Sequence, residues 1–208
     1  MSSGSETSDW SRIPAALASD VSGRSGAMAG AIRALSGDRL VGRAHTLRVV
    51  AGDNRSIHFA LATTEPGSVL VVDAGGYADR AVWGGVLTEA AMLRGIAGLV
   101  LDGAIRDLAE IRERGFPVFA RGTSPAGPHK SGGGTARGII SCGGVAVAQG
   151  DLIVADLDGV TVVPQARISA TLDAAKKRHS LERSWVDRIR AGEDSAAVLG
   201  LGPEQVGE

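Results

Sequence analysis

Residues 83–122 read WGGVLTEAAMLRGIAGLVLDGAIRDLAEIRERGFPVFARG, and this stretch decides the fold. Its apolar runs are punctuated by glycines, and they predict four elements in order. These are a helix over 86–94, a strand over 97–101, a helix over 107–114 and a strand over 117–120. A strand, a short helix and a second strand in that order imply two parallel strands joined by a helical crossover. The chain is therefore predicted to belong to the α/β class.

The segments before this stretch carry clear local signals of their own. Glycines break up short apolar groups, β-branched residues form runs, and Asp and Asn stand at turns. The predicted elements are two short helices within 13–35, a strand over 40–50, a helix capped by Asp53 or Asn54 and ending near Thr63, and a buried strand over 68–76.

The segments after it differ in character. The Gly-, Ser- and Pro-rich stretch 122–138 predicts a loop longer than the usual ~4–6 residues, and such loops are either mobile or functional. Residues 139–164 predict short strands joined by tight turns, which makes the second half strand-rich. Residues 168–190 predict a charged helix with one apolar stripe. Leu181 lies off that stripe, which predicts either a break or a second contact surface near His179.

Composition bounds the architecture. With 208 residues, 44% of them hydrophobic, the chain can bury one core, so we expect a flexible arm over 1–12 and a single α/β domain over 13–208 that includes the C-terminal helix. Cys142 stands alone, which excludes an internal disulfide and a cysteine-based zinc site. No apolar run approaches the ~20 residues that span a bilayer, and the polar N-terminus is not a secretory signal. A cytoplasmic protein is expected.

The tightest cluster of unlike charges is Arg106-Asp107 followed by Glu110. Asp107 comes where a strand ends and a helix begins, which is where open α/β folds gather ligands. Two carboxylates one turn apart suit Mg²⁺, which keeps several waters and needs only one or two carboxylates. The same spacing also fits a capping box, in which both carboxylates satisfy free helix N–H groups. From spacing alone, both interpretations stay open.

A second element lies close to this cluster in sequence. Gly84-Gly85 opens the predicted helix over 86–94, so the free N–H groups of Val86 and Leu87 point at whatever lies in front of them. Helix N-termini bind carboxylates and phosphates. The glycines are equally explained by a tight turn.

The chain resembles the family that contains the regulator of ribonuclease E activity A and the class II 4-hydroxy-4-methyl-2-oxoglutarate aldolases. The likeness runs from about Ile13 to Pro164 and rests on short motifs: Gly52-Asp53-Asn54, PGSVLVVDAGG (66–76), AVWGG (81–85), GLVLDGAIRD (98–107), GTSP (122–125), SCGGVAV (141–147) and GDLIVADLDGVTVVP (150–164). The most specific motif is Gly85 followed at a fixed spacing by Arg106-Asp107 and Glu110. This combination favours a metal site.

The resemblance implies a fold, an assembly and a metal. The fold is the swivelling β/β/α sandwich, in which the parallel βαβ segment carries the site, and the chain forms homotrimers or homohexamers with sites between subunits. By this likeness, Asp107 ligates Mg²⁺ or Mn²⁺ and Glu110 holds water on that metal. Glu193, in the motif RAGED, is the counterpart of a glutamate that reaches the site of a neighbouring subunit.

The resemblance also implies a reaction. Arg106 faces the keto oxygen of pyruvate, and the N–H groups of Val86 and Leu87 hold its carboxylate. The implied activity is that of a metal-dependent lyase: retro-aldol cleavage of a 4-hydroxy-2-oxo acid to pyruvate, or decarboxylation of oxaloacetate, both through a metal-stabilised pyruvate enolate. Gly85 stands where aldolases carry an acid, which favours decarboxylation, and Glu89 is a candidate substitute.

The alternative is a non-enzymatic protein that binds and regulates a ribonuclease. Glu110 favours the enzyme, because the bacterial regulator lacks an acid at that place. A net charge of −1 and the acids interleaved within 176–190 argue against nucleic acid as a partner and favour a helix that packs between subunits. For His58 we favour a core or cap role, and for Lys130 a solvated loop charge over contact with the distal carboxylate of a substrate.

Overall fold

The structure, a computed structural model, describes residues 9–202. These residues contain a nine-stranded mixed sheet with the order β1-β6-β5-β3-β2-β10-β11, in which β4 pairs with β5 and β7 with β2, and a separate β8-β9 hairpin. The strands are β1 Arg33–Ser36, β2 Leu40–Val49, β3 Val69–Asp73, β4 Ala81–Trp83, β5 Gly98–Ile105, β6 Val118–Thr123, β7 Gly134–Ala136, β8 Ile140–Cys142, β9 Val145–Val147, β10 Leu152–Asp156 and β11 Gly159–Val163. The predicted α/β class is confirmed.

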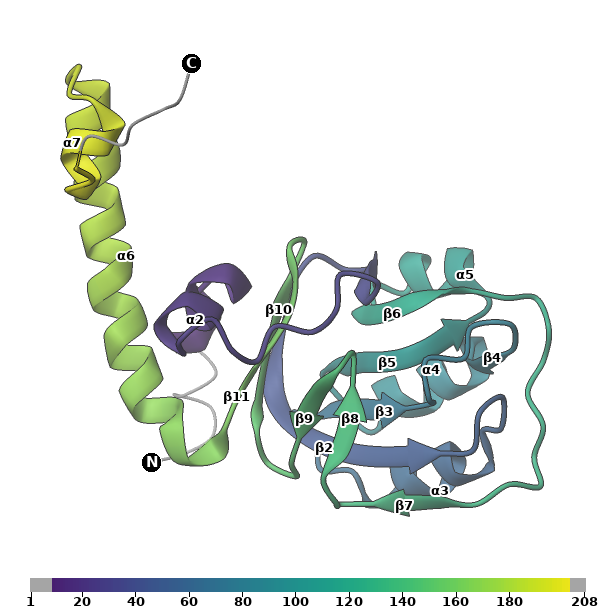
Figure 1. Cartoon of the computed structure of the whole chain (residues 1–208). Coiled ribbons are helices and arrows are strands. Elements are labelled where there is room, and N and C mark those ends of the chain that lie inside the picture. Colours follow the sequence, from purple (N-terminus) through teal and green to yellow (C-terminus); the bar gives the residue numbers. More distant parts are fainter. Residues whose placement is uncertain (1–8, 203–208) are drawn as a thin grey trace.

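Helices pack on the sheet in two places, and the long helix near the C-terminus projects away from it (Figure 1). They are α2 Ala15–Val21, α3 Arg55–Thr63, α4 Gly85–Leu93, α5 Leu108–Glu113, the short 3₁₀ helix η1 Gln165–Arg167, α6 Ile168–Arg190 and α7 Ser195–Leu199. Helices α3, α4 and α5 lie against one face of the parallel strands, and the β8-β9 hairpin lies against the other. None of the helices within residues 9–202 is both long enough and apolar enough to cross a membrane.

Strand β3 shows why its sequence is apolar without alternation. Successive side chains of a strand point to opposite faces. Leu70 and Val72 pack with the helices α3 to α5, whereas Val69 and Val71 pack with the β8-β9 hairpin. Both faces of this parallel strand are therefore buried, as expected for a run of consecutive β-branched and aliphatic residues. Cys142 is buried in the hairpin-side core, and burial raises the pKa of its thiol.

The decisive stretch folds largely as predicted, with one extension that matters. Strand β5 pairs in parallel with both β3 and β6, so the helix α5 is the predicted crossover. The strand continues four residues beyond the predicted end at Leu101, to Ile105, because its second half gains the partner β4. The backbone N–H of Arg106 donates to the Trp83 carbonyl (2.9 Å). This register brings the end of β5 beside the start of α4.

Two predicted elements are wrong. Only one helix forms within residues 13–35, because Gly23 and Gly26 adopt positive φ (78° and 84°), which ends the helix, and Arg33–Ser36 pairs as strand β1 with β6. Of the two alternatives predicted near His179, the break is absent: α6 runs without interruption. Its first half packs on the domain through buried Ile168 and Ala175, and the second half projects away from the sheet (Figure 1).

The N-terminal arm and the loop over 122–138 are two segments for which neither a helix nor a strand was predicted. Of the predicted arm, residues 1–8 lie outside the described part, while Trp10 is fully buried against α2 and α6. The predicted long loop over 122–138 contains β7, which pairs antiparallel with β2, and the strand β4 was not predicted. Both strands are three residues long, too short to leave a periodic pattern in the sequence.

Candidate functional site

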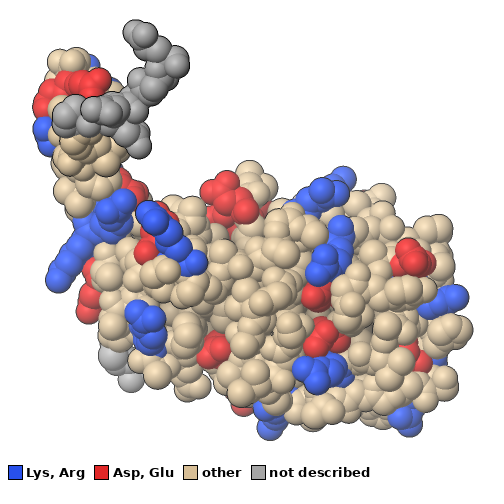
Figure 2. Space-filling view, viewed as in Figure 1, with Lys and Arg blue, Asp and Glu red and all other residues tan. Residues whose placement is uncertain are grey.

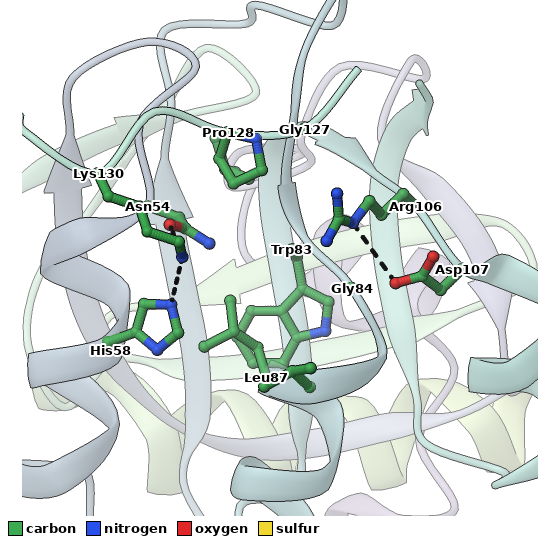
Figure 3. Close-up of a pocket in the computed structure, with 12 residues that line it drawn as sticks. Asn54, His58, Trp83, Gly84, Leu87, Arg106, Asp107, Gly127, Pro128 and Lys130 are labelled. Atoms are coloured by element: carbon green, nitrogen blue, oxygen red, sulfur yellow. Dashed lines mark hydrogen bonds and ion pairs between the residues drawn. The ribbon is translucent and has the colours of Figure 1, made fainter. Parts of the chain in front are cut away.

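A cavity of about 360 Å³ opens where β5 ends and α4 begins (Figure 3). Its walls come from four places in the sequence: the start of α3, the β4-α4 junction, the end of β5 and the loop before β7. The lining residues are Asn54, His58, Val82, Trp83, Gly84, Val86, Leu87, Arg106, Asp107, Gly127, Pro128 and Lys130. The βαβ segment thus contributes one wall, and segments from outside it contribute the opposite one.

Asp107 is the N-cap residue of α5, but its side chain does not cap that helix. Its backbone is left-handed (φ 57°, ψ 35°), and its side chain makes no capping hydrogen bond. Oδ2 instead accepts a hydrogen bond from the Gly85 N–H (3.0 Å) and lies 3.5 Å from Nε of Arg106. The capping-box interpretation is therefore wrong, because the left-handed turn directs the carboxylate away from its own helix and toward the start of α4.

Both glycines at the start of α4 make room for carboxylates. A Cβ at Gly84 would lie 2.5 Å from Oδ2 of Asp107, and a Cβ at Gly85 would lie 2.5 Å from Oε2 of Glu110. The two carboxylates therefore lie over consecutive glycines. Any side chain at Gly85, including the acid found in aldolases, would displace Glu110. We call this arrangement of Gly84, Gly85 and the carboxylates of Asp107 and Glu110 the cradle. It explains the pair of glycines more specifically than a tight turn does.

The cradle fits a hard divalent cation. Carboxylate oxygens are the ligands that Mg²⁺ prefers, and one or two of them suffice when water completes the shell. Within residues 9–202, no group of three or more His, Cys, Asp or Glu side chains has metal-binding geometry. Asp107 and Glu110 would hold such a cation together with water or ligand oxygens.

Glu110 is also part of a small ionic bridge. Oε1 of Glu110 accepts from Nη2 of Arg114 (2.8 Å), and the other arm of Arg114 contacts Glu89 on α4. Neither Glu89 nor Glu110 lines the cavity, but the Glu110 carboxylate lies against Gly85 at its edge and Glu89 does not. The structure therefore gives no support to Glu89 as a substitute for the acid missing at Gly85.

The cavity also has donors for an anion. Val86 and Leu87, in the first turn of α4, line its wall beside Arg106. The first backbone N–H groups of a helix have no partner within it and carry partial positive charge. The Arg106 side chain is 43% exposed and points across the opening of the cavity (Figure 3). A guanidinium and a helix N-terminus on one wall suit a carboxylate with an adjacent oxygen.

The opposite wall was not predicted as a site. Nζ of Lys130 donates to Oδ1 of Asn54 (3.1 Å) and lies 3.1 Å from Nε2 of His58. Partial burial, followed by the charge of Lys130, lowers the pKa of His58, so its imidazole is neutral at pH 7 and accepts from the ammonium. His58 therefore faces the cavity and not the core, which corrects the core or cap role. Lys130 also lines the cavity, and it is exposed, in agreement with a solvated loop charge.

Asp53 holds the loop that carries Lys130. Its buried carboxylate accepts from the N–H groups of Arg55 (2.9 Å), Ser131 (2.8 Å) and Gly132 (2.7 Å). Burial alone would raise the pKa of Asp53, but these donors and His129 outweigh it and hold the pKa below its usual value. A lowered carboxyl pKa stabilises the fold above the unfolded-state pKa, and that stabilisation is lost as the pH falls through the folded-state value. The loop is thus clamped at neutral pH.

A matched pair of glycines tests this clamp. A Cβ at Gly132 would lie 2.8 Å from Cγ of Asp53, whereas a Cβ at Gly133 would meet nothing within 4 Å. Gly132→Ala is expected to destabilise the protein by about 1–3 kcal/mol, because it forces the clamp apart. Gly133→Ala is expected to change stability by less than about 0.5 kcal/mol. Urea unfolding of both variants measures the difference, and equal effects would contradict the clamp.

Glu193 lies away from this cavity. It follows the projecting helix α6, and both of its carboxylate oxygens accept from Arg188 (2.6–3.0 Å). The bonds to Arg188 hold the pKa of Glu193 below its usual value. Figure 1 shows the end of α6 at the opposite side of the molecule from α4 and β4. Within one chain, Glu193 takes no part in the site.

The fold and the cavity define an α/β protein with a cavity in which a guanidinium, a helix N-terminus and the carboxylate of Asp107 meet. The chain matches the RraA-like family (aldolase/RraA) over residues 9–162, and it belongs to this family. It is 43% identical over 158 residues to the "Putative 4-hydroxy-4-methyl-2-oxoglutarate aldolase" of Halalkalibacterium halodurans, covering 74% of this chain and 75% of that protein. It is 37% identical to the 4-hydroxy-4-methyl-2-oxoglutarate aldolase of Thermus thermophilus, covering 61% and 77%.

Solved structures agree on the fold. Streptomyces coelicolor RraAS2, described as an unusual member of the RNase ES inhibitor RraA family, superimposes with a TM-score of 0.78 at 31% identity, covering 86% of this chain and 94% of that one. The RNA-processing inhibitor RraA from Thermus gives 0.65 at 34% identity, covering 71% and 90%. The expected family and its fold are confirmed, and relatives carry both enzyme and inhibitor names.

Proposed function

We propose that this protein is a divalent-metal-dependent carbon–carbon lyase that acts on small 2-oxo acids. The observation that carries the proposal is the orientation of Asp107. Its carboxylate points away from its own helix α5 and toward the start of α4, beside Arg106. A left-handed backbone at a residue other than glycine is typical of a functional position, and the Asp107 carboxylate accepts from the first N–H of α4 and makes no bond to its own helix. The aldolase names of two relatives point in the same direction.

The substrate is oriented by the βαβ wall of the cavity. Its carboxylate lies against the N–H groups of Val86 and Leu87, and its keto oxygen faces Arg106. Asp107 and Glu110 would hold Mg²⁺ or Mn²⁺, which would supply Lewis acidity for the keto group. Arg106 supplies a planar pair of donors at the same oxygen.

Bond cleavage then follows one course for both reactions. The C3–C4 bond breaks, its electron pair forms the C2–C3 double bond, and negative charge moves to the keto oxygen. Arg106 stabilises that charge more strongly than the neutral carbonyl, which is the condition for lowering the barrier. A proton added at C3 gives pyruvate. The other fragment leaves as CO₂ from oxaloacetate or as a carbonyl compound from a 4-hydroxy-2-oxo acid.

Decarboxylation is the reaction that this chain is better equipped to perform. Retro-aldol cleavage must also remove a proton from the C4 hydroxyl, and Gly85 provides no base for that step. Glu89 is engaged by Arg114 outside the cavity. Decarboxylation needs no such base, so oxaloacetate is the substrate of choice for a first assay.

Metal removal tests the proposal directly. We expect pyruvate release from oxaloacetate in the presence of Mg²⁺, loss of that activity with EDTA, and recovery when excess Mg²⁺ or Mn²⁺ is added. A blank without protein corrects for decarboxylation in buffer. Release that EDTA leaves unchanged would contradict a metal-dependent lyase. If no metal gives pyruvate release, the alternative of a non-enzymatic regulator would be favoured. The Thermus relative, an RNA-processing inhibitor, supports that alternative.

We further propose a homotrimer or homohexamer with sites between subunits. The projecting half of α6 carries exposed apolar side chains, Leu181 (45%), Val186 (45%) and Ile189 (43%), which a neighbouring copy would bury. Such an arrangement is what would bring Glu193 of one copy to the cavity of another. On the face seen in Figure 2, basic and acidic side chains are scattered over the sheet domain without a continuous basic field, so this face gives no support to a nucleic-acid partner.

A further inference from the structure

We propose that a second pocket, lined by Arg43, His45 and Arg137, binds a small tetrahedral oxyanion, either inorganic phosphate or the phosphate group of a small metabolite. The pocket has a volume of about 190 Å³ and shares no lining residue with the cavity beside Arg106. Its lining includes Ser68, immediately before β3, whereas that cavity lies where β5, parallel to β3, ends. The two sites are at opposite ends of the parallel strands, and the proposal does not depend on lyase activity.

The buried imidazole of His45 is the first reason. His45 is 2% exposed, and its Nε2 has no hydrogen-bond partner within residues 9–202. Buried polar atoms are nearly always hydrogen-bonded, so an unpaired one calls for an explanation. Burial, followed by the charge of Arg137, lowers the pKa of His45 against the opposing effect of Glu65, so the imidazole is neutral at pH 7. An anion in the pocket would supply a counter-charge for the protonated imidazole, which has two N–H donors.

The guanidinium groups on the pocket are the second reason. Nη1 of Arg43 donates to the Gly150 carbonyl (3.0 Å), and Nη2 of Arg137 donates to the Thr63 carbonyl (3.1 Å). No carboxylate in the described part of the chain forms an ion pair with Arg137. A guanidinium has five N–H donors in a planar fork that matches a phosphate group, so one bond to a carbonyl leaves donors for a ligand. Arg137 can therefore grip an oxyanion directly.

The backbone fixes Arg137 at the pocket before a ligand arrives. Its φ is 60°, and among the residues from 9 to 202 only Arg24 and Asp107 share a positive φ without being glycine. The Arg137 N–H donates to the Thr46 carbonyl of β2 (2.8 Å). A left-handed backbone is unfavourable for an arginine and persists only where the surrounding structure holds it. The turn after β7 thus ties this guanidinium to the strand that carries His45.

The remaining polar side chains complete the selection of an oxyanion. Oε1 of Gln149 accepts from the Thr46 N–H (3.1 Å), and this bond does not use the amide NH₂ group. Glu65 is the one acidic side chain that lines the pocket, so two guanidiniums stand against one carboxylate. The volume is below the ~300 Å³ at which sites for larger ligands begin, which suits a single phosphate group.

A phosphate titration followed by NMR of the histidine side chains tests the proposal. His45 reports on this pocket and His58 on the cavity beside Arg106, so binding at the two places is distinguished. For the wild-type protein we expect the His45 ring signals to shift with a Kd of about 1 mM or tighter at pH 7. Arg137→Gln, at an exposed position, is expected to weaken this binding at least about tenfold. Arg33→Gln, exposed on β1, is the matched control and should behave as wild type.

A second variant makes the test independent of any loss of folding. Glu65→Gln removes the one negative charge from the lining and is expected to tighten phosphate binding by about threefold. Glycerol 3-phosphate distinguishes the two sources of the anion. Tighter binding than inorganic phosphate supports a site for the phosphate group of a metabolite, and weaker binding supports a site for inorganic phosphate itself.

The outcomes are clear for the pocket and leave the lyase untouched. A shift of the His45 signals that Arg137→Gln removes and Arg33→Gln keeps is the expected result. His45 signals that stay unmoved up to about 20 mM phosphate, or a shift that survives in Arg137→Gln, would overturn the proposal. Weaker binding in Glu65→Gln, or a shift of the His58 signals alone, would overturn it as well, whereas none of these results bears on pyruvate release.

Discussion

Asp107→Asn is expected to lower kcat for oxaloacetate decarboxylation by at least about 1,000-fold, a loss at the upper end for a single electrostatic group in an active site. The amide keeps the shape of the side chain and still accepts from the Gly85 N–H, but it removes the negative charge that would hold a divalent cation. Asparagine also tolerates the left-handed backbone at this position, whereas alanine would add about 1–2 kcal/mol of strain. Rate measurement with saturating Mg²⁺ gives the effect on turnover.

Two further measurements make this prediction specific. Mn²⁺ binding, followed by electron paramagnetic resonance, should be lost together with activity. The melting temperature should stay within about 3 °C of wild type, because asparagine keeps an acceptor for the Gly85 N–H and Asp107 makes no capping bond to α5. Asp38→Asn, at an exposed turn position between β1 and β2, is the matched control and should keep both activity and Mn²⁺ binding. An Asp107→Asn protein with normal rates would remove the metal-ligand assignment altogether.

Arg106→Lys is expected to reduce kcat/KM by about 100-fold, although the charge is kept. A lysine ammonium is a point charge and cannot present two parallel donors to a carboxylate or to the adjacent oxygen. The loss should appear both in turnover and in the affinity for pyruvate, because Arg106 contacts the ligand in the ground state as well as in the transition state. Steady-state kinetics and calorimetry measure the two contributions.

The metal readout distinguishes the two residues. Arg106→Lys should bind Mn²⁺ as well as wild type or better, because the basic side chain beside Asp107 becomes shorter and more flexible. Arg33→Lys, at an exposed position of the edge strand β1, is the control for a general effect of the substitution. Near-normal kcat/KM in Arg106→Lys would contradict the role of the planar guanidinium, whereas loss of Mn²⁺ binding would mean that the substitution had disturbed Asp107.

Local signals in the sequence were sufficient for most elements. The runs that became β2, β3 and β6 are rich in β-branched and apolar residues, and each forms a strand within a few residues of its predicted bounds. Helix α4 begins at Gly85 and ends before Gly95, whose φ is 69°. These elements follow from interactions between neighbours in the chain, which is the information that periodicity and turn residues carry.

Elements that depend on a distant partner escaped prediction. Arg33–Ser36 has no strand signal of its own and becomes β1 through its pairing with β6. Strand β4 exists because it extends the pairing of β5. The continuous helix α6 likewise follows from where it packs, since its first half is anchored on the domain and its second half projects away from the sheet.

The sequence by itself determined the α/β class, the order of the main elements and the resemblance that singled out Arg106, Asp107 and Glu110. Spacing could not decide whether Asp107 capped a helix or faced a cavity, because that choice depends on a left-handed backbone and on the position of α4. Only the tertiary structure placed Lys130 beside Asn54, 76 positions away. Contacts across such separations arise from sheet topology and loop packing, and a linear pattern does not record them.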